Sequence, residues 1–593
     1  MEARFSNLLT RTCIVGCLLG SAGTVYLLAG LAGLVHNAVL NLTIAAALIA
    51  TLIFFLVNFF ALFTQTGWVG RCIWLAILAI LIAETLLGLL PPTSRDELTH
   101  HLAIPRLYAE AGRIIEVPMA PYAYYPMLLD MLYTPWIYWG YDFVPKWIHA
   151  LYGALTGLLL YAYLGSRMNA VYGVLGAYFF LSTPVIMRLS QWGYIDLGIT
   201  FYTTAALLLL VRWRENRADF ISLALAGLSL GFALATKPNG LVVALVVTML
   251  FVLVLAKPPW ENLVASVREV AIFGILTFAP FFPWLGKNWW QTGNPFYPFF
   301  PGWFPTRDGL SGDVVSFTGI GIFDKRELLY GENVWQIIAL PLRLFFSGQD
   351  DNPQYFDGVL TPILILLLPW AFQGKWCEDK KLLASFSLLT LLYGIFLVDL
   401  RARYVLSIVP PLVILLVYAV FNIYLRVKRP AILFAGLLMF AAWHSAFLWK
   451  YVAVAEPWYY LLGVENRDDY LSRTLPEYPT FRYINRETPA NAKIYLLFIG
   501  RRAYYCQRNY FHDGGELPGF LLGAIRNANA TEQLAQSLKQ KGITHLMVRE
   551  DLLNRFLSNN LSSNQARLWN EFAASRLRLS FREQGHAVYQ LNG

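Results

Sequence analysis

The chain has 593 residues, of which 57% are hydrophobic, 16% are aromatic and only 14% are charged, and its mean hydropathy is +0.49. Soluble domains carry about 25% charged residues, so a soluble protein of this length is excluded, and the aromatic content excludes a disordered chain. The 46 basic and 37 acidic residues give a net charge of +9. In so apolar a chain this excess indicates cytoplasmic loops rich in lysine and arginine rather than a nucleic-acid partner.

Apolar runs recur over residues 1–449 and predict a polytopic α-helical membrane protein. A spanning helix needs about 17–25 mostly apolar residues. On that criterion we expect about 13 transmembrane helices, near residues 12–35, 40–64, 71–91, 147–165, 170–187, 195–213, 219–236, 239–256, 270–286, 358–373, 382–398, 404–425 and 430–449. With the N-terminus inside, cytoplasmic loops then contain Arg71, Arg167, Arg214, Lys257, Lys375 and Lys428. An odd number of spans places the C-terminus outside.

Three exterior segments are too long to be simple turns, namely residues 91–146, 287–357 and 450–593. Residues 120–140 are aromatic and interrupted by proline, which favours a helix lying at the membrane surface.

The last exterior segment has ordinary polarity, unlike the rest of the chain. Its pattern predicts a strand at Lys493–Ile499, a helix at Thr531–Lys541 and a strand at Ile543–Val548. We therefore expect a transmembrane domain over residues 1–449 and a small exported α/β domain over residues 450–593.

Several function classes lack their sequence signatures. There is no P-loop or glycine-rich nucleotide fingerprint, which disfavours an ATP-driven pump. The G-x-S-x-G pattern at Gly227–Gly231 lies inside a predicted span and not at the strand-to-helix turn that forms the elbow of serine hydrolases. The five cysteines and eight histidines form no metal-ligand pattern, so the sequence indicates no metal site and leaves a divalent cation open.

Acidic residues stand at the predicted outer ends of two spans. Asp96 and Glu97 are adjacent in the first exterior segment. Neighbouring carboxylates raise each other's pKa, which favours one as a proton acceptor, although the pair also fits a solvated helix start. His100 is expected to line the same place. Asp196 begins the sixth span, where it is either a functional acid or the ion-pair partner of Arg188.

Basic residues on the exterior side run against the usual cytoplasmic bias. They are Lys237 and Lys287, which each follow a predicted span, and Arg401 and Arg403, which both precede the span near 404–425. Lysine and arginine at the headgroup level can hold a phosphate, and arginine can bind it through two hydrogen bonds. Anchoring to lipid headgroups explains any one of them alone.

Taken together, these motifs resemble the GT-C fold glycosyltransferases, polytopic enzymes that use polyprenyl-phosphate sugars. The closest resemblance is to the group of the protein O-mannosyltransferases and the lipid A aminoarabinose transferase. The matching segments are Asp96-Glu97 followed by His100, Tyr194-Ile195-Asp196-Leu197, Lys237-Pro238-Asn239-Gly240, Gly293-Asn294-Pro295-Phe296-Tyr297-Pro298, and Arg403-Tyr404 followed by Pro410-Pro411. Two extra spans before the acidic segment depart from the pattern of many relatives, and His100 stands where some have an aromatic residue.

The resemblance implies an inverting glycosyltransferase of the inner (plasma) membrane, with its active site and C-terminal domain on the periplasmic side. It would transfer a sugar from a polyprenyl-phosphate donor to a lipid, glycan or protein, and the motifs identify neither sugar nor acceptor. Asp96 would be the general base and Glu97 its positioning partner or an acceptor contact. The expected substrate-binding residues are Asp196, Lys237, Arg403, Tyr404, Lys287, Arg188, His100, Asn294 and Tyr297.

Two other functions remain open from the residues. A transporter or lipid flippase would carry charges near the bilayer midplane, whereas here they stand at span ends. A related glycan polymerase or ligase would share the lipid-linked donor.

Overall fold

The computed structural model describes residues 2–252, 263–300, 302–304, 307, 322–373, 377–395, 400–513 and 517–592. The predicted spans near 239–256 and 382–398 lie partly outside these residues, and so do the loop residues Lys257 and Lys375.

Long apolar helices build the body of the molecule. They are α1 (Glu2–Leu31), α2 (Ala38–Gln65), α3 (Trp68–Gly88), α6 (Val144–Arg167), α7 (Ala170–Leu181), α9 (Asp196–Glu215), α10 (Phe220–Thr236), α11 (Gly240–Leu250), α12 (Leu263–Phe278), α13 (Phe282–Thr292), α19 (Glu378–Ile395), α20 (Val409–Tyr424) and α21 (Pro430–Ala455). Shorter helices connect them: η1 (Glu97–His101), α4 (Ala103–Ala111), η2 (Pro121–Tyr124), α5 (Leu128–Tyr138), α8 (Pro184–Leu189), α14 (Ile322–Tyr330), α15 (Val334–Ile338), α16 (Leu340–Phe346), η6 (Pro353–Tyr355), α17 (Ile363–Leu366), α18 (Leu368–Ala371) and η7 (Ala402–Ile408).

Every predicted apolar run coincides with at least one helix in the part of the chain that the structure describes. Among the described residues, six helices are long and apolar enough to cross a membrane, or seven if α12 and α13 form one bent span. The mostly helical membrane fold is therefore confirmed, and the number of about 13 spans stays a prediction.

Proline divides two of the predicted spans. The run near 270–286 is bent by 51° between α12 and α13, where Pro283 begins the second helix. The run near 358–373 forms only the short helices α17 and α18, with Pro369 at the start of the second. A proline lacks the backbone N–H that continues a helix and its ring clashes with the preceding turn, which hydropathy does not detect.

The aromatic segment near residues 120–140 is enclosed by protein, so the surface-helix prediction is wrong. Its helix α5 packs against α1, α4 and α6. Residues Leu128–Pro135 are all buried. The bulky side chains that suggested a membrane surface fill the core instead.

The C-terminal segment folds as the predicted mixed α/β unit. It contains α22 (Pro457–Leu461), α23 (Arg467–Thr474), α24 (Tyr478–Glu487), β1 (Lys493–Leu497), β2 (Asn509–Phe511), α25 (Gly519–Asn527), α26 (Thr531–Gln540), β3 (His545–Arg549), α27 (Glu550–Asn560), α28 (Ser563–Arg576), β4 (Leu577–Glu583) and β5 (His586–Leu591). The predicted strand, helix and strand correspond to β1, α26 and β3. The strand order is β2-β1-β3-β5-β4, in which β1 pairs in parallel with β2 and β3 and the remaining pairs are antiparallel.

Both faces of this sheet are buried. Tyr495 and Leu497 point to a core shared with α25, α26, α27 and α28, whereas Ile494 and Leu496 pack with Phe481 of α24 on the other face. The carboxyl ends of the three parallel strands remain available at the edge of the sheet.

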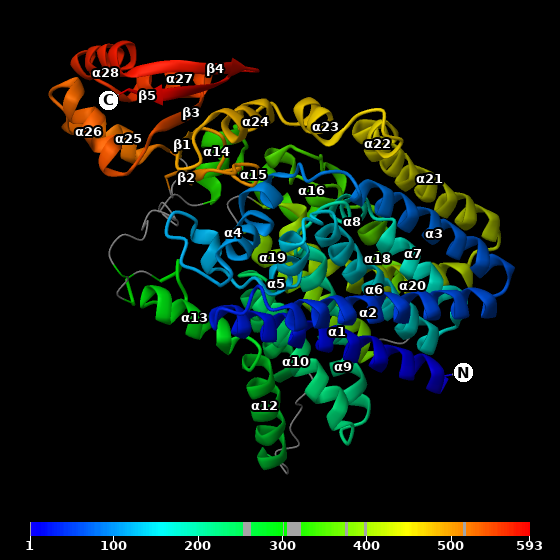
Figure 1. The fold of residues 1–593 in the computed structure, drawn as a ribbon. Helices are drawn as coiled ribbons and strands as arrows, with labels where there is room; N and C mark the ends of the chain where they lie inside the picture. The colour runs from blue at the N-terminus through cyan, green and yellow to red at the C-terminus, as the bar shows by residue number, and fades with distance from the viewer. Residues whose placement is uncertain are drawn as a thin grey trace.

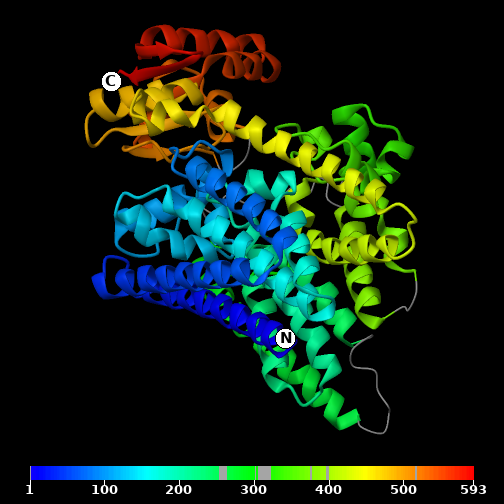
Figure 2. The ribbon, with the colours of Figure 1, turned by 90° about the vertical axis from the view of Figure 1, so that its right-hand side faces the viewer.

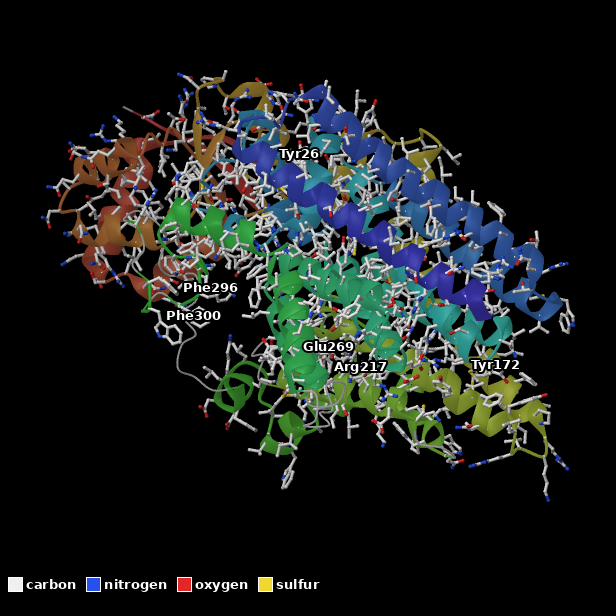
Figure 3. The ribbon with its side chains drawn as sticks, turned by 90° about the horizontal axis from the view of Figure 1, so that it is seen from below. Tyr26, Tyr172, Arg217, Glu269, Phe296 and Phe300 are labelled. Atoms are coloured by element: carbon white, nitrogen blue, oxygen red, sulfur yellow. The ribbon has the colours of Figure 1, made fainter. Side chains whose placement is uncertain are left out.

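The α/β domain and α12 lie at opposite ends of the molecule in two perpendicular views (Figures 1 and 2). Near the α12 end, Arg217 and Glu269 lie side by side in the view from below (Figure 3), and Arg217 donates a hydrogen bond of 2.9 Å to Glu269. The Arg217 loop, predicted to be cytoplasmic, is thus remote from the domain predicted to be exported.

Candidate active site

A cavity of about 860 Å³ lies between the helical body and the α/β domain. From the helical body it is lined by Arg95, Asp96, Thr99, His100, His101, Tyr122, Tyr125, Asp130, Lys237, Asn239, Arg401, Arg403 and Tyr404, among others. From the α/β domain it is lined by Arg501, Arg502, His512, Asp513 and Arg549, among others. Cations outnumber acids among these residues, so the cavity suits an anionic ligand.

Asp96 and Arg403 meet in this cavity. Arg403 Nη1 lies 2.6 Å from Asp96 Oδ2, and the guanidinium stacks over Tyr194 and Tyr404 at 5.0 and 5.4 Å from the ring centroids. Burial alone would raise the pKa of Asp96, but the charge of Arg403, helped by His100 and His101, holds that pKa well below its usual range. Asp96 is therefore an ionised carboxylate whose second oxygen, Oδ1, has no hydrogen-bond partner among the described residues.

Glu97 points away from the cavity. Its two carboxylate oxygens accept hydrogen bonds from the backbone N–H groups of Ser94 at 3.0 Å and Gly193 at 2.6 Å. Burial raises its pKa, although Lys146 and these backbone groups favour the ionised form. Glu97 thus ties the acidic segment to the start of α9, and of its two predicted roles the geometry favours the positioning one.

Lys237 forms a second buried ion pair beside the cavity. Its Nζ lies 2.6 Å from Asp196 Oδ1 and 5.2 Å from the centroid of the Tyr404 ring. The predicted pairing of Asp196 with Arg188 is wrong. Arg188 lies too far along α8 and instead contacts Asp350 and Asp357, both at 3.1–3.2 Å, while Lys237 reaches Asp196 from the end of α10.

Lys287, Asn294 and Tyr297 do not line the cavity but stabilise the loops around it. Lys287 donates to the carbonyl of Ala123, and Asn288 beside it donates to the carbonyl of Tyr124, so α13 fixes η2. Asn294 closes the following turn through Phe296 N and Phe299 O. Tyr297 packs edge-on against Tyr124. Of the predicted set, Asp96, His100, Lys237, Arg403 and Tyr404 line the cavity.

Sequence reasoning missed a histidine–aspartate pair in the same cavity. His101 Nδ1 lies 2.8 Å from Asp130 Oδ1, and both side chains are almost fully enclosed. The available signal was Asp130 itself, an acid inside an apolar helix, because a buried carboxylate needs a partner.

The α/β domain completes the cavity through its parallel strands. Residues Phe498–Arg502 follow β1, His512 and Asp513 follow β2, and Arg549 ends β3. Ligands of α/β sheets bind outside the carboxyl ends of such strands.

The loop after β1 also binds the acidic segment directly. Tyr504 N donates to Leu98 O at 3.2 Å, and Tyr505 Oη donates to Pro92 O at 2.6 Å. The domain is therefore part of the site rather than an appendage.

The sequence leaves a divalent cation open. No group of three or more His, Cys, Asp or Glu side chains there is arranged to hold a metal ion.

Comparison with known proteins supports the resemblance drawn from the motifs. The sequence model of the family described as dolichyl-phosphate-mannose-protein mannosyltransferase matches residues 100–292, about a third of the chain. No curated protein matches the full sequence.

Two solved structures share the fold across nearly their whole length. ArnT from Cupriavidus metallidurans in the apo state is similar with a TM-score of 0.54 and 12% identity, over 89% of this chain and 98% of ArnT. ArnT bound to undecaprenyl phosphate is similar with a TM-score of 0.51 and 13% identity, over 88% of this chain and 98% of ArnT. The resemblance to the GT-C mannosyltransferase and ArnT group is confirmed at the level of the fold.

Proposed function

We propose that this protein is a membrane glycosyltransferase that transfers a sugar from a polyprenyl-phosphate donor to an acceptor at the outer face of the inner membrane. The observation that carries the proposal is the single cavity in which Asp96, Arg403 and Lys237 converge. Such a reaction requires cations for the departing phosphate and a carboxylate for the acceptor. The fold shared with ArnT, one structure of which holds undecaprenyl phosphate, supports the same donor class.

The geometry suggests a division of roles. Arg403 and Lys237 neutralise the donor phosphate, and the Tyr404 ring lies beside both cations. Asp96 accepts a hydrogen bond from the acceptor hydroxyl through Oδ1 and removes its proton as the anomeric carbon is attacked. Attack opposite the leaving phosphate inverts the configuration at that carbon, and the phosphate leaves with the bonding electron pair. His100 and Asp196 shape the surroundings of these groups.

A strain without the gene tests this proposal. Mass spectrometry of its envelope lipids, glycans and proteins is expected to show one sugar missing from one class of acceptor. Expression of the wild-type chain should restore the sugar. An unchanged envelope, together with no transfer from labelled polyprenyl-phosphate sugars in membranes, would contradict the proposal.

Arg403 and Arg188 are expected to respond differently to substitution, one in donor binding and the other in thermal stability. We expect Arg403→Gln to weaken binding of undecaprenyl phosphate by roughly 10-fold or more, since a hydrogen bond to a charged group contributes about 1.5–3 kcal/mol. Arg188→Gln breaks the contacts to Asp350, Asp351 and Asp357 and the cation–π contact to Trp192, all outside the cavity. It should lower the midpoint of thermal unfolding and keep the affinity. Equal loss of affinity in both variants would refute the assignment of the phosphate site.

A further inference from the structure

The His101–Asp130 pair has the arrangement of a proton-accepting dyad. Asp130 Oδ1 lies 2.8 Å from Nδ1 of His101, and Nε2 has no hydrogen-bond partner among the described residues. With Asp130 ionised, Nδ1 carries the proton and Nε2 presents a lone pair. Since His101 lines the cavity, that lone pair is available to the reaction.

Burial of Asp130 argues against a purely structural pair. The carboxylate is 0% exposed, and its Oδ2 has no hydrogen-bond partner in the part of the chain that the structure describes. An enclosed carboxylate with one bare oxygen is costly unless its charge is used or neutralised. A proton taken up by the imidazole would neutralise it.

The backbone brings His101 toward the side of Asp96. Residues Glu97–His101 form a single π-helical turn, in which Leu102 N donates to Glu97 O, five residues earlier, at 3.0 Å. In an α-helix, residues five apart point about 140° away from each other, whereas the wider π-helical turn, with its i→i+5 hydrogen bond, reduces that angle. Such turns recur at functional sites, and here both Asp96 and His101 line the cavity.

Asp96 by itself cannot retain a proton. Its ion pair with Arg403 favours the charged carboxylate so strongly that a proton taken from the acceptor must move on. The departing phosphate needs the same arginine. A neutral base close by would resolve this conflict.

We propose that Nε2 of His101 receives the proton that Asp96 removes from the acceptor, an inference that rests on the proposed function. Asp130 is then a positioning residue that holds the imidazole. The acceptor O–H bond breaks and its oxygen forms the new bond to the anomeric carbon. The bond from that carbon to the phosphate oxygen breaks, and the electron pair leaves with the phosphate. The proton passes from Asp96 to Nε2, and the imidazolium pairs with the Asp130 carboxylate.

This assignment predicts a loss of transfer rate at low pH. Burial raises the pKa of Asp130 to about 7, although His100 and Lys237 oppose the shift, and burial lowers the pKa of His101. The pair therefore takes up one proton as the pH falls through about 7. A protonated Asp130 donates to Nδ1, so the imidazole carries its own proton on Nε2 and loses the lone pair there. The charged and titratable groups facing the pair are Asp96, His100, Tyr108, Tyr133, His149, Tyr194, Asp196, Lys237 and Arg403.

The experiment measures initial transfer rates against pH in membranes of the deletion strain that carry each full-length variant. His101→Gln should slow transfer by about 100-fold or more and remove the fall near pH 7. Asp130→Asn should slow it and move the fall to lower pH, because burial without the carboxylate depresses the imidazole pKa. His512 is a buried histidine of the same cavity without a carboxylate partner. In His512→Gln the transfer rate should decline at the same pH as in the wild type.

Binding of undecaprenyl phosphate to purified protein controls for folding and should be the same in all these variants. If wild-type membranes transfer no sugar, the proposed function fails. If they do, and His101→Gln or Asp130→Asn retains the wild-type rate and pH profile, the dyad assignment is overturned while glycosyl transfer stands.

Discussion

Asp96→Asn is expected to reduce the rate of sugar transfer by about 10²–10⁴-fold, the usual contribution of a general base. The amide keeps the volume of the side chain but can neither accept the acceptor proton nor balance the charge of Arg403. The measurement is the initial rate from a labelled polyprenyl-phosphate sugar, normalised to folded protein.

A matched control separates chemistry from stability. Asp142 is also a buried aspartate paired with an arginine, Arg467, and it accepts from Tyr504 Oη at 3.0 Å, but it lies outside the cavity. Asp142→Asn should reduce the amount of folded protein and leave the rate per folded molecule close to wild type. A similar rate loss per molecule in both variants would show that Asp96 acts through folding alone.

Lys237→Met is expected to lower the free energy of unfolding by about 3–5 kcal/mol, the usual cost of removing one partner of a buried ion pair. The substitution leaves Asp196, which is 0% exposed, with a charge that only more distant groups oppose. Thermal unfolding in detergent measures the loss, and undecaprenyl phosphate binding should weaken in the same variant because the phosphate loses a cation.

The double variant Asp196→Leu/Lys237→Met distinguishes these two effects. Replacing both partners by apolar side chains removes the unpaired charge, so most of the stability should return. Binding of undecaprenyl phosphate should stay weak. Recovery of binding together with stability would mean that Lys237 serves the fold and not the phosphate.

Sequence patterns were reliable where the information is local. The apolar runs predicted the helical body because each helix must bury its own apolar surface, and the alternation in residues 493–499 and 543–548 predicted β1 and β3 for the same reason. The breaks at Pro283 and Pro369 were missed because hydropathy averages over a window. The buried position of α5 was missed because a surface helix and a core helix share its composition.

In the candidate site, too, the sequence predicted some features correctly and missed others. The motifs selected Asp96, Lys237 and Arg403 individually, and the structure brings all three to one cavity. The motifs assigned Lys287, Asn294 and Tyr297 to substrate as well, whereas Lys287 and Tyr297 contact η2 and Asn294 closes the turn before Phe299. A motif records which residues matter in a segment but not which direction each side chain faces.

The sequence alone determined that this chain is a membrane protein with an α/β domain and a set of charges kept at span ends, because hydropathy and motif order are properties of contiguous residues. Only the tertiary structure decided which charges meet. Asp96 pairs with Arg403, Asp196 with Lys237 rather than Arg188, and His101 with Asp130. These pairs join residues far apart in the chain, and burial makes each one necessary, since an enclosed charge is stable only beside its partner.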